Sequence, residues 1–152
     1  VVLRTLSKAY ALAGARCGVA IAAEPLIDVM SKVLPPYSFP TPVVETVIEA
    51  LSAERLPASR AAVDGISRER TRVRSALDAL PCVSNTWPSD ANFVLTRFAD
   101  LPGVLAYLRE RGILIRSFGD TDGLQSCARI TIGAAAENGA LLDALEAFGR
   151  PG

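Results

Sequence analysis

The segment Arg4 to Gly18, RTLSKAYALAGARCG, gathers several groups that can bind a phosphate or attack a carbonyl. A partly desolvated lysine amine, here Lys8, can form a Schiff base with a carbonyl compound. Arg16 can bind a phosphate through two N–H donors, and Thr5 and Ser7 add hydroxyls. The spacing also fits a surface lysine followed by a helix-end arginine, so the residue types alone leave both interpretations open.

The chain on both sides of Lys8 predicts how these groups are held. VVLRTL before it and CGVAIAA after it are apolar, β-branched runs typical of buried strands. Lys8 therefore lies on a turn just beyond a buried strand, which is where α/β sheets place their ligands. Two strands do not form a stable sheet alone, so we expect this pair to need partner strands that the chain does not supply, or to pair irregularly.

The composition is that of a globular protein without a strong net field. Its 152 residues, 50% of them hydrophobic, can bury a core as one domain or two small lobes. Sixteen basic residues balance sixteen acidic ones, which argues against recruitment by nucleic acid or an anionic membrane. Three cysteines without any histidine argue against a metal site or a disulfide framework, and favour a reducing cytoplasm.

The N-terminus carries no targeting signal that we recognise. It lacks the layout of a signal peptide, and no apolar run reaches the roughly 18 residues that span a bilayer. The chain begins at Val1 rather than Met. We therefore expect it to be part of a longer protein.

The remaining sequence predicts three helices followed by a small α/β lobe. Apolar spacing and proline positions predict helices at residues 25–34, 41–53 and 58–80. Residues 81–150 form a predicted β-α-β-β-α unit, with ANFVLTRF, ILIRSF and ARITIG as its strands. The arginines at positions 68, 70, 72 and 74 are expected to form a solvated helix face rather than a nucleic-acid patch.

The segment SKAYALAGARCG resembles the lysine motif S-K-(A/T)-x-x-x-(A/P)-G-x-R-x-G of fold-type I, pyridoxal-phosphate-dependent aminotransferases. Together with KVLPPYSFPTPV, ANFVLTRF, GILIRSFG and RITIG, it makes the whole chain similar to the class II-like histidinol-phosphate aminotransferase family. The similarity covers only the C-terminal portion, somewhat under half, of that family's chain. It implies an α/β fold with a remnant of the large cofactor-binding domain at 1–56, a connecting helix at 57–80 and a small α/β domain at 81–152.

The resemblance also implies roles for individual residues. Lys8 would bind pyridoxal 5'-phosphate covalently, and Ser7 and Arg16 would hold the cofactor phosphate. Arg129 would bind the carboxylate of the glutamate-type substrate and, helped by Arg116, the phosphate of the other substrate. Two further substrate-binding candidates are Asn92, whose alternative role is a local backbone contact, and Tyr37, whose alternative role is packing.

The activity implied by the resemblance is transamination between L-histidinol phosphate and 2-oxoglutarate in histidine biosynthesis. Such an enzyme would be a cytoplasmic homodimer that acts on small molecules, without nucleic acid, membrane or metal. A threonine-phosphate decarboxylase-like enzyme or an aromatic aminotransferase would carry a nearly identical lysine motif. A truncated, noncatalytic domain is the alternative of another class. We expect the chain to be inactive alone, because the family's aspartate, asparagine and tyrosine contacts to the cofactor belong to segments upstream of Val1.

Overall fold

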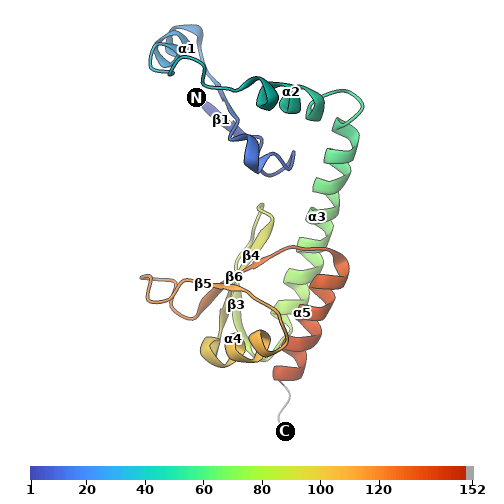
Figure 1. The fold of residues 1–152 in the computed structure, drawn as a ribbon. Coiled ribbons are helices and arrows are strands. Elements are labelled where there is room, and N and C mark those ends of the chain that lie inside the picture. Colours follow the sequence, from blue (N-terminus) through green and yellow to red (C-terminus); the bar gives the residue numbers. More distant parts are fainter. Residues whose placement is uncertain (150–152) are drawn as a thin grey trace. The chain divides into compact units, whose positions relative to one another are not determined.

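The computed structural model describes residues 1–149, and Figure 1 shows its fold. The chain forms two compact units, Val1–Val63 and a second that begins at Asp64. Helix α3 (Leu56–Asp78) runs through the boundary between them. Each unit is considered separately below.

The first unit contains one short antiparallel ribbon and two helices. Its elements in chain order are β1 (Val2–Thr5), the 3-10 helix η1 (Ala13–Ala15), β2 (Gly18–Ile21), α1 (Glu24–Ser31) and α2 (Thr41–Ala50). The two predicted strands are confirmed, and they pair with each other from Val2 opposite Ile21 to Thr5 opposite Gly18. Glycine suits position 18, because a Cβ there would lie 3.1 Å from the carbonyl oxygen of Arg4, a tight contact.

The apolar side chains of the first unit are mostly exposed. All four residues of β1 are exposed, so the prediction of a buried strand is wrong for the described residues. The reason is that a two-stranded ribbon has two faces and the unit provides no layer to cover them. Leu6 is the one buried hydrophobic residue of Val1–Val63.

The helices of the first unit are shorter than predicted at their C-terminal ends. The predicted helix at 25–34 ends at Ser31, and the predicted helix at 41–53 ends at Ala50. The residue at the N-cap of α2 is Pro40, and no side chain caps this helix. Thr41 and Pro42 instead open the first turn, where proline's fixed φ is favourable.

The second unit is a four-stranded antiparallel sheet with helices packed on one face. Its elements after α3 are β3 (Val83–Thr86), β4 (Phe93–Phe98), α4 (Leu101–Glu110), β5 (Arg116–Ser117), β6 (Cys127–Thr131) and α5 (Ala135–Phe148). The strand order is β3-β4-β6-β5. The sequence-based prediction missed β3, whose pairing with β4 contains a register shift, and made β5 too long.

The hydrophobic core of the second unit lies between the sheet and its three helices. On β4, buried and half-buried residues alternate, as expected for a sheet with one covered face. On β6, Ala128 and Ile130 are buried and Arg129 between them is half-buried. The fully buried core side chains from strands and helices include Val94, Phe98, Ile130, Val73, Leu77, Val104, Leu108 and Leu145. The opposite sheet face carries Phe93, Leu95, Arg97 and Arg129.

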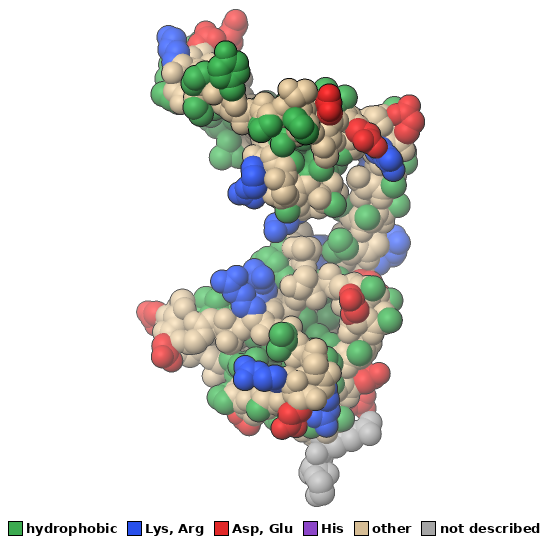
Figure 2. Space-filling model, in the orientation of Figure 1, with side chains coloured by type: hydrophobic (Ala, Val, Ile, Leu, Met, Phe, Trp, Pro, Cys, Tyr) green, Lys and Arg blue, Asp and Glu red, His purple; other side chains and the backbone are tan. Residues whose placement is uncertain are grey.

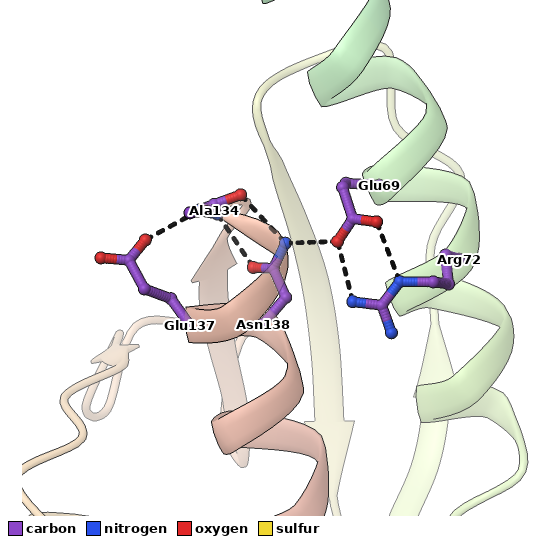
Figure 3. Close-up of polar contacts among 6 residues, drawn as sticks. Glu69, Arg72, Ala134, Glu137 and Asn138 are labelled. Atoms are coloured by element: carbon purple, nitrogen blue, oxygen red, sulfur yellow. Dashed lines mark hydrogen bonds and ion pairs between the residues drawn. The ribbon is translucent and has the colours of Figure 1, made fainter.

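The start of α5 lacks a side-chain N-cap. Ala134 holds the N-cap position with extended backbone angles, φ −65° and ψ 157°, but its side chain cannot accept a hydrogen bond. Half of a capping box is present, because the Ala134 N–H donates to Glu137 Oε2 at 2.8 Å (Figure 3). The missing half is a side-chain oxygen at position 134 that would accept from the N–H of Glu137.

We therefore expect Ala134→Ser to stabilise the protein. A serine oxygen could accept from the N–H of Glu137 and complete the capping box, which should raise the free energy of unfolding by about 1 kcal/mol. In a thermal unfolding measurement, we expect the midpoint temperature to rise by roughly 2–4 °C. Ala135→Ser is the matched control, because residue 135 is already inside the helix. Equal effects of both substitutions would contradict the capping explanation.

A buried amide links the start of α5 to the middle of α3. Asn138 is 3% exposed; its Nδ2 donates to Glu69 Oε2 at 2.9 Å and to the Gly133 carbonyl at 3.0 Å. Its Oδ1 accepts from the Gly133 N–H at 2.9 Å. Glu69 in turn accepts two hydrogen bonds from Arg72, at 2.9 and 2.8 Å (Figure 3). This network fixes the turn that follows β6.

The same network predicts a pH dependence of stability. The hydrogen bonds from Arg72 and Asn138 lower the pKa of Glu69 from 4.5 to about 2. A depressed folded-state pKa contributes stability above pH 4.5 that is lost as the pH falls toward 2. We expect the thermal unfolding temperature of the wild type to fall more steeply between pH 4.5 and pH 2 than that of Glu69→Gln. Glu110→Gln, on an exposed side chain, serves as the control, and an identical pH dependence of all three proteins would contradict the assignment.

Candidate functional site

The loop between β1 and β2 carries the first group of predicted site residues, Ser7, Lys8 and Arg16. Two backbone hydrogen bonds close this loop around the buried Leu6. Its N–H donates to the Cys17 carbonyl at 3.2 Å, and its carbonyl accepts from the Leu12 N–H at 3.2 Å. Lys8 and Arg16, eight positions apart in the sequence, therefore belong to one closed loop.

The loop backbone adopts an uncommon conformation twice. Ala11 has φ 56° and Arg16 has φ 51°, both in the left-handed region that residues with a Cβ mostly avoid. Ala11 ends the turn that follows Lys8, since its N–H donates to the Lys8 carbonyl at 3.0 Å. Such conformations cost about 1–3 kcal/mol each and concentrate at functional sites.

The side chains of this loop form a small set of anion-binding groups. The Thr5 hydroxyl donates to Ser7 Oγ at 2.9 Å and accepts from the Ser7 N–H at 3.2 Å. One guanidinium N–H of Arg16 donates to the Ala13 carbonyl at 3.2 Å. Lys8 and Arg16 are exposed, and within residues 1–149 neither has a carboxylate in ion-pair distance. Two cations and two hydroxyls in one short loop are groups that can bind a phosphate.

The second group of predicted residues lies on the sheet of the second unit. Arg116 on β5 is directly opposite Arg129 on β6, so both side chains belong to the same sheet face. Arg129 is half-buried, its Cζ lies 5.3 Å from the ring centre of Phe93, and its buried Nε has no hydrogen-bond partner in the structure. Arg116 is exposed. Like charges placed directly opposite each other are destabilising, and a bound anion relieves that repulsion.

The two remaining candidates have different surroundings. The Asn92 carbonyl accepts from the Ile132 N–H at 2.9 Å, which ties the start of β4 to the end of β6. This contact uses the main-chain carbonyl, so it tests neither of the roles expected for the Asn92 side chain, which stays a substrate-binding prediction. Tyr37 is 98% exposed with φ 58°, so within the described residues its side chain has no packing role.

Sequence reasoning missed Arg97, which lies on the same sheet face as Arg129. Arg97 is opposite Cys127, two residues along from the Leu95–Arg129 pair. Its Cζ lies 5.3 Å from the ring centre of Trp87, and its Nη2 donates to the Gly123 carbonyl at 3.1 Å. The two-residue period of ANFVLTRF would have placed it on that face, once the helix-covered face was known.

The arginine-rich helix face is solvated, as predicted, at Arg68 and Arg72, whereas Arg70 and Arg74 are half-buried. Arg70 is half-buried and donates to the Ala91 carbonyl at 2.8 Å. Arg72 pairs with Glu69, and Arg74 lies 3.8 Å from Asp78. Three of the four arginines are thus engaged by the second unit itself.

Two possible features have no counterpart in residues 1–149. None of the helices in this range combines the length and the apolar character that crossing a bilayer requires. Side chains of histidine, cysteine, aspartate and glutamate form no cluster of three or more that could bind a metal ion in the same range.

Comparison with known proteins gives consistent matches over almost the whole chain. The family model described as Aminotransferase class I and II matches residues 1–148. A histidinol-phosphate aminotransferase of Pasteurella multocida is 41% identical over 144 residues, which is 95% of this chain and 41% of that protein. The chain thus spans about two fifths of the length of this curated relative.

Two solved structures extend the comparison to the fold. A protein of Burkholderia pseudomallei assigned as an aminotransferase superposes with a TM-score of 0.86 at 34% identity, covering 97% of this chain and 44% of that one. A histidinol-phosphate aminotransferase of Sinorhizobium meliloti in complex with pyridoxal-5'-phosphate has a TM-score of 0.74 at 26% identity. The aligned region covers 95% of this chain and 39% of the Sinorhizobium meliloti chain.

Proposed function

Because the chain belongs to the class I and II aminotransferase family, we propose that it supplies the C-terminal part of an enzyme that transaminates L-histidinol phosphate with 2-oxoglutarate. The identity to the Pasteurella multocida protein of that name supports the choice of substrates. The predicted resemblance to this family and the predicted α/β fold are confirmed. The activity concerns the complete enzyme.

The observation that carries this proposal is the pairing of Arg116 with Arg129 across β5 and β6. A dual-substrate transaminase must accept a carboxylate in one half-reaction and a phosphate in the other. The planar guanidinium fork binds both anions through paired N–H donors. Two guanidinium groups lie on one sheet face, and neither has a carboxylate partner among the described residues. Such a pair suits a site that binds a carboxylate and a phosphate in turn.

The cofactor that we assign to the β1–β2 loop is pyridoxal 5'-phosphate, which withdraws electrons from the substrate Cα when bound. Lys8 would hold it covalently through Nζ. Ser7 and Arg16 would bind its phosphate, with the Arg16 guanidinium already oriented by the Ala13 carbonyl. As a free amine, Lys8 Nζ would also accept and return the proton of the substrate Cα.

The proposed organisation follows from the same membership. Residues 1–56 would belong to the large cofactor-binding domain, and residues 81–152 would form the small C-terminal domain. Residues 57–80 would form the helix that connects these two domains. The exposed apolar residues of β1 support the first assignment, since a larger sheet would cover them. We further propose a homodimeric, cytoplasmic enzyme of histidine biosynthesis, for which the reduced cysteines are suitable.

Product analysis tests the proposed function. The complete enzyme, loaded with pyridoxal phosphate, is incubated with histidinol phosphate and 2-oxoglutarate, and glutamate formation is followed. Parallel reactions use threonine phosphate, with detection of carbon dioxide, and phenylalanine as amino donor. Glutamate from histidinol phosphate is the expected outcome. Preferential carbon dioxide release, preferential use of phenylalanine, or no turnover at all would contradict it and favour one of the three alternatives.

A further inference from the structure

Arg97 belongs to the same sheet face as the paired Arg116 and Arg129. Arg97 and Arg129 are diagonal neighbours, because Arg129 is opposite Leu95 and Arg97 follows Leu95 by two residues on β4. Diagonal neighbours in an antiparallel pair are about 7–8 Å apart, within the range of a strong charge effect. Figure 2 shows basic side chains gathered over this sheet.

The Arg97 guanidinium is held in place before any ligand arrives. Trp87 lies under it at 5.3 Å, and the Gly123 carbonyl accepts from its Nη2 at 3.1 Å. Its Nε is buried and has no hydrogen-bond partner in the structure. A cation fixed by one aromatic ring and one neutral carbonyl keeps its full charge, and it needs no reordering when an anion binds.

The positive charge on this face is not compensated. Within residues 1–149, no carboxylate lies in ion-pair distance of Arg97, Arg116 or Arg129. Other arginines of the chain do have such partners, namely Arg55, Arg72, Arg74 and Arg111. Three guanidinium groups on one sheet face without a carboxylate partner suit an anionic ligand.

We propose that Arg97 is a specificity-determining residue that makes this face favour phosphate monoesters over carboxylates, acting through its charge rather than by contact. A phosphate monoester carries nearly two negative charges at neutral pH and a carboxylate carries one. The attraction to a fixed cation is therefore about twice as large for the phosphate. The inference rests on the proposed function, which assigns one substrate of each kind to Arg116 and Arg129.

Arg97→Met tests the charge, because methionine can still pack against Trp87. If kcat/KM for glutamate falls about threefold, kcat/KM for histidinol phosphate should fall roughly tenfold. The reason is that doubling the interaction energy squares the factor by which kcat/KM falls. The losses should lie mainly in KM and shrink at high ionic strength. Arg97→Lys should retain most of the preference.

Arg111→Met is the matched control. Arg111 also lies over an aromatic ring, that of Tyr107 at 3.4 Å, but it belongs to the end of α4 rather than to the sheet. Its replacement should leave the ratio of the two kcat/KM values unchanged. Equal losses for both substrates in Arg97→Met would overturn the inference and assign Arg97 to support of the Gly123 loop. An Arg97→Lys variant as impaired as Arg97→Met would overturn it as well.

A binding measurement separates this inference from the proposed function. Inorganic phosphate and acetate are titrated as competitors of glutamate binding, in the wild type and in Arg97→Met. We expect the wild type to favour phosphate and the variant to lose most of that preference. A wild type that does not turn over histidinol phosphate would refute the proposed function while leaving this test intact. A wild type without preference for phosphate over acetate would refute the role of Arg97.

Discussion

Lys8→Ala in the complete enzyme is expected to lower kcat by about four orders of magnitude, because one amine is assigned both covalent binding of the cofactor and proton transfer at the substrate Cα. No second lysine of the chain can substitute in the β1–β2 loop. The chain contains only two lysines, and the other, Lys32, is the C-cap residue of α1. Lys8 is exposed, so its replacement should leave folding intact and the expected loss is chemical.

Lys32→Ala is a closely matched control, since both lysines follow a serine and both are exposed. It should leave kcat within about twofold of the wild type, as for surface changes in general. A small primary amine added to the Lys8→Ala enzyme should restore part of the turnover, because the free amine can take over proton transfer. Activity of Lys8→Ala close to that of the wild type would contradict the assignment.

Arg129→Ala is expected to impair both half-reactions by about 2–4 kcal/mol in transition-state stabilisation, as for loss of a charge-assisted contact. Arg129 is half-buried against Phe93 and has a buried Nε without a partner, so its fork is positioned by the sheet. Arg129→Lys should recover little, because an ammonium cannot present two parallel N–H donors. Steady-state kcat/KM values with glutamate and with histidinol phosphate measure the losses.

Arg116→Ala should affect histidinol phosphate more than glutamate, since Arg116 is the exposed partner assigned to the phosphate only. Arg109→Ala provides the control, as an exposed arginine in the last turn of α4. Equal losses with both substrates in Arg116→Ala would contradict the phosphate role. Unchanged kinetics in Arg129→Ala would contradict the shared anion site.

Much of the fold could be predicted because local sequence signals agreed with the tertiary structure. Proline in the first turn marks the starts of α1, α2 and α4, and the apolar, β-prone run in ANFVLTRF marks β4. The strand β3 was missed because its residues, VSNT, have mixed β-propensity and are held by pairing with β4. The strand β5 is short because only Arg116 and Ser117 pair with β6.

The predictability of the candidate site differed between its parts. Lys8, Ser7 and Arg16 lie within one short motif, so a local sequence signal was enough to find them. Arg97 and Arg129 become neighbours only through the β4–β6 register, which is a nonlocal pairing. The link from Asn138 to Glu69 spans 69 positions, and no local pattern in either helix indicates it.

The covalent attachment of the cofactor tests the central claim most directly. The complete enzyme is mixed with pyridoxal phosphate, reduced with borohydride to make the bond permanent, digested and mapped by mass spectrometry. We expect a visible absorption band before reduction, and afterwards a single modified peptide with the adduct on Lys8. An adduct on Lys32 or on any lysine outside this chain, or no adduct at saturating cofactor, would contradict the account.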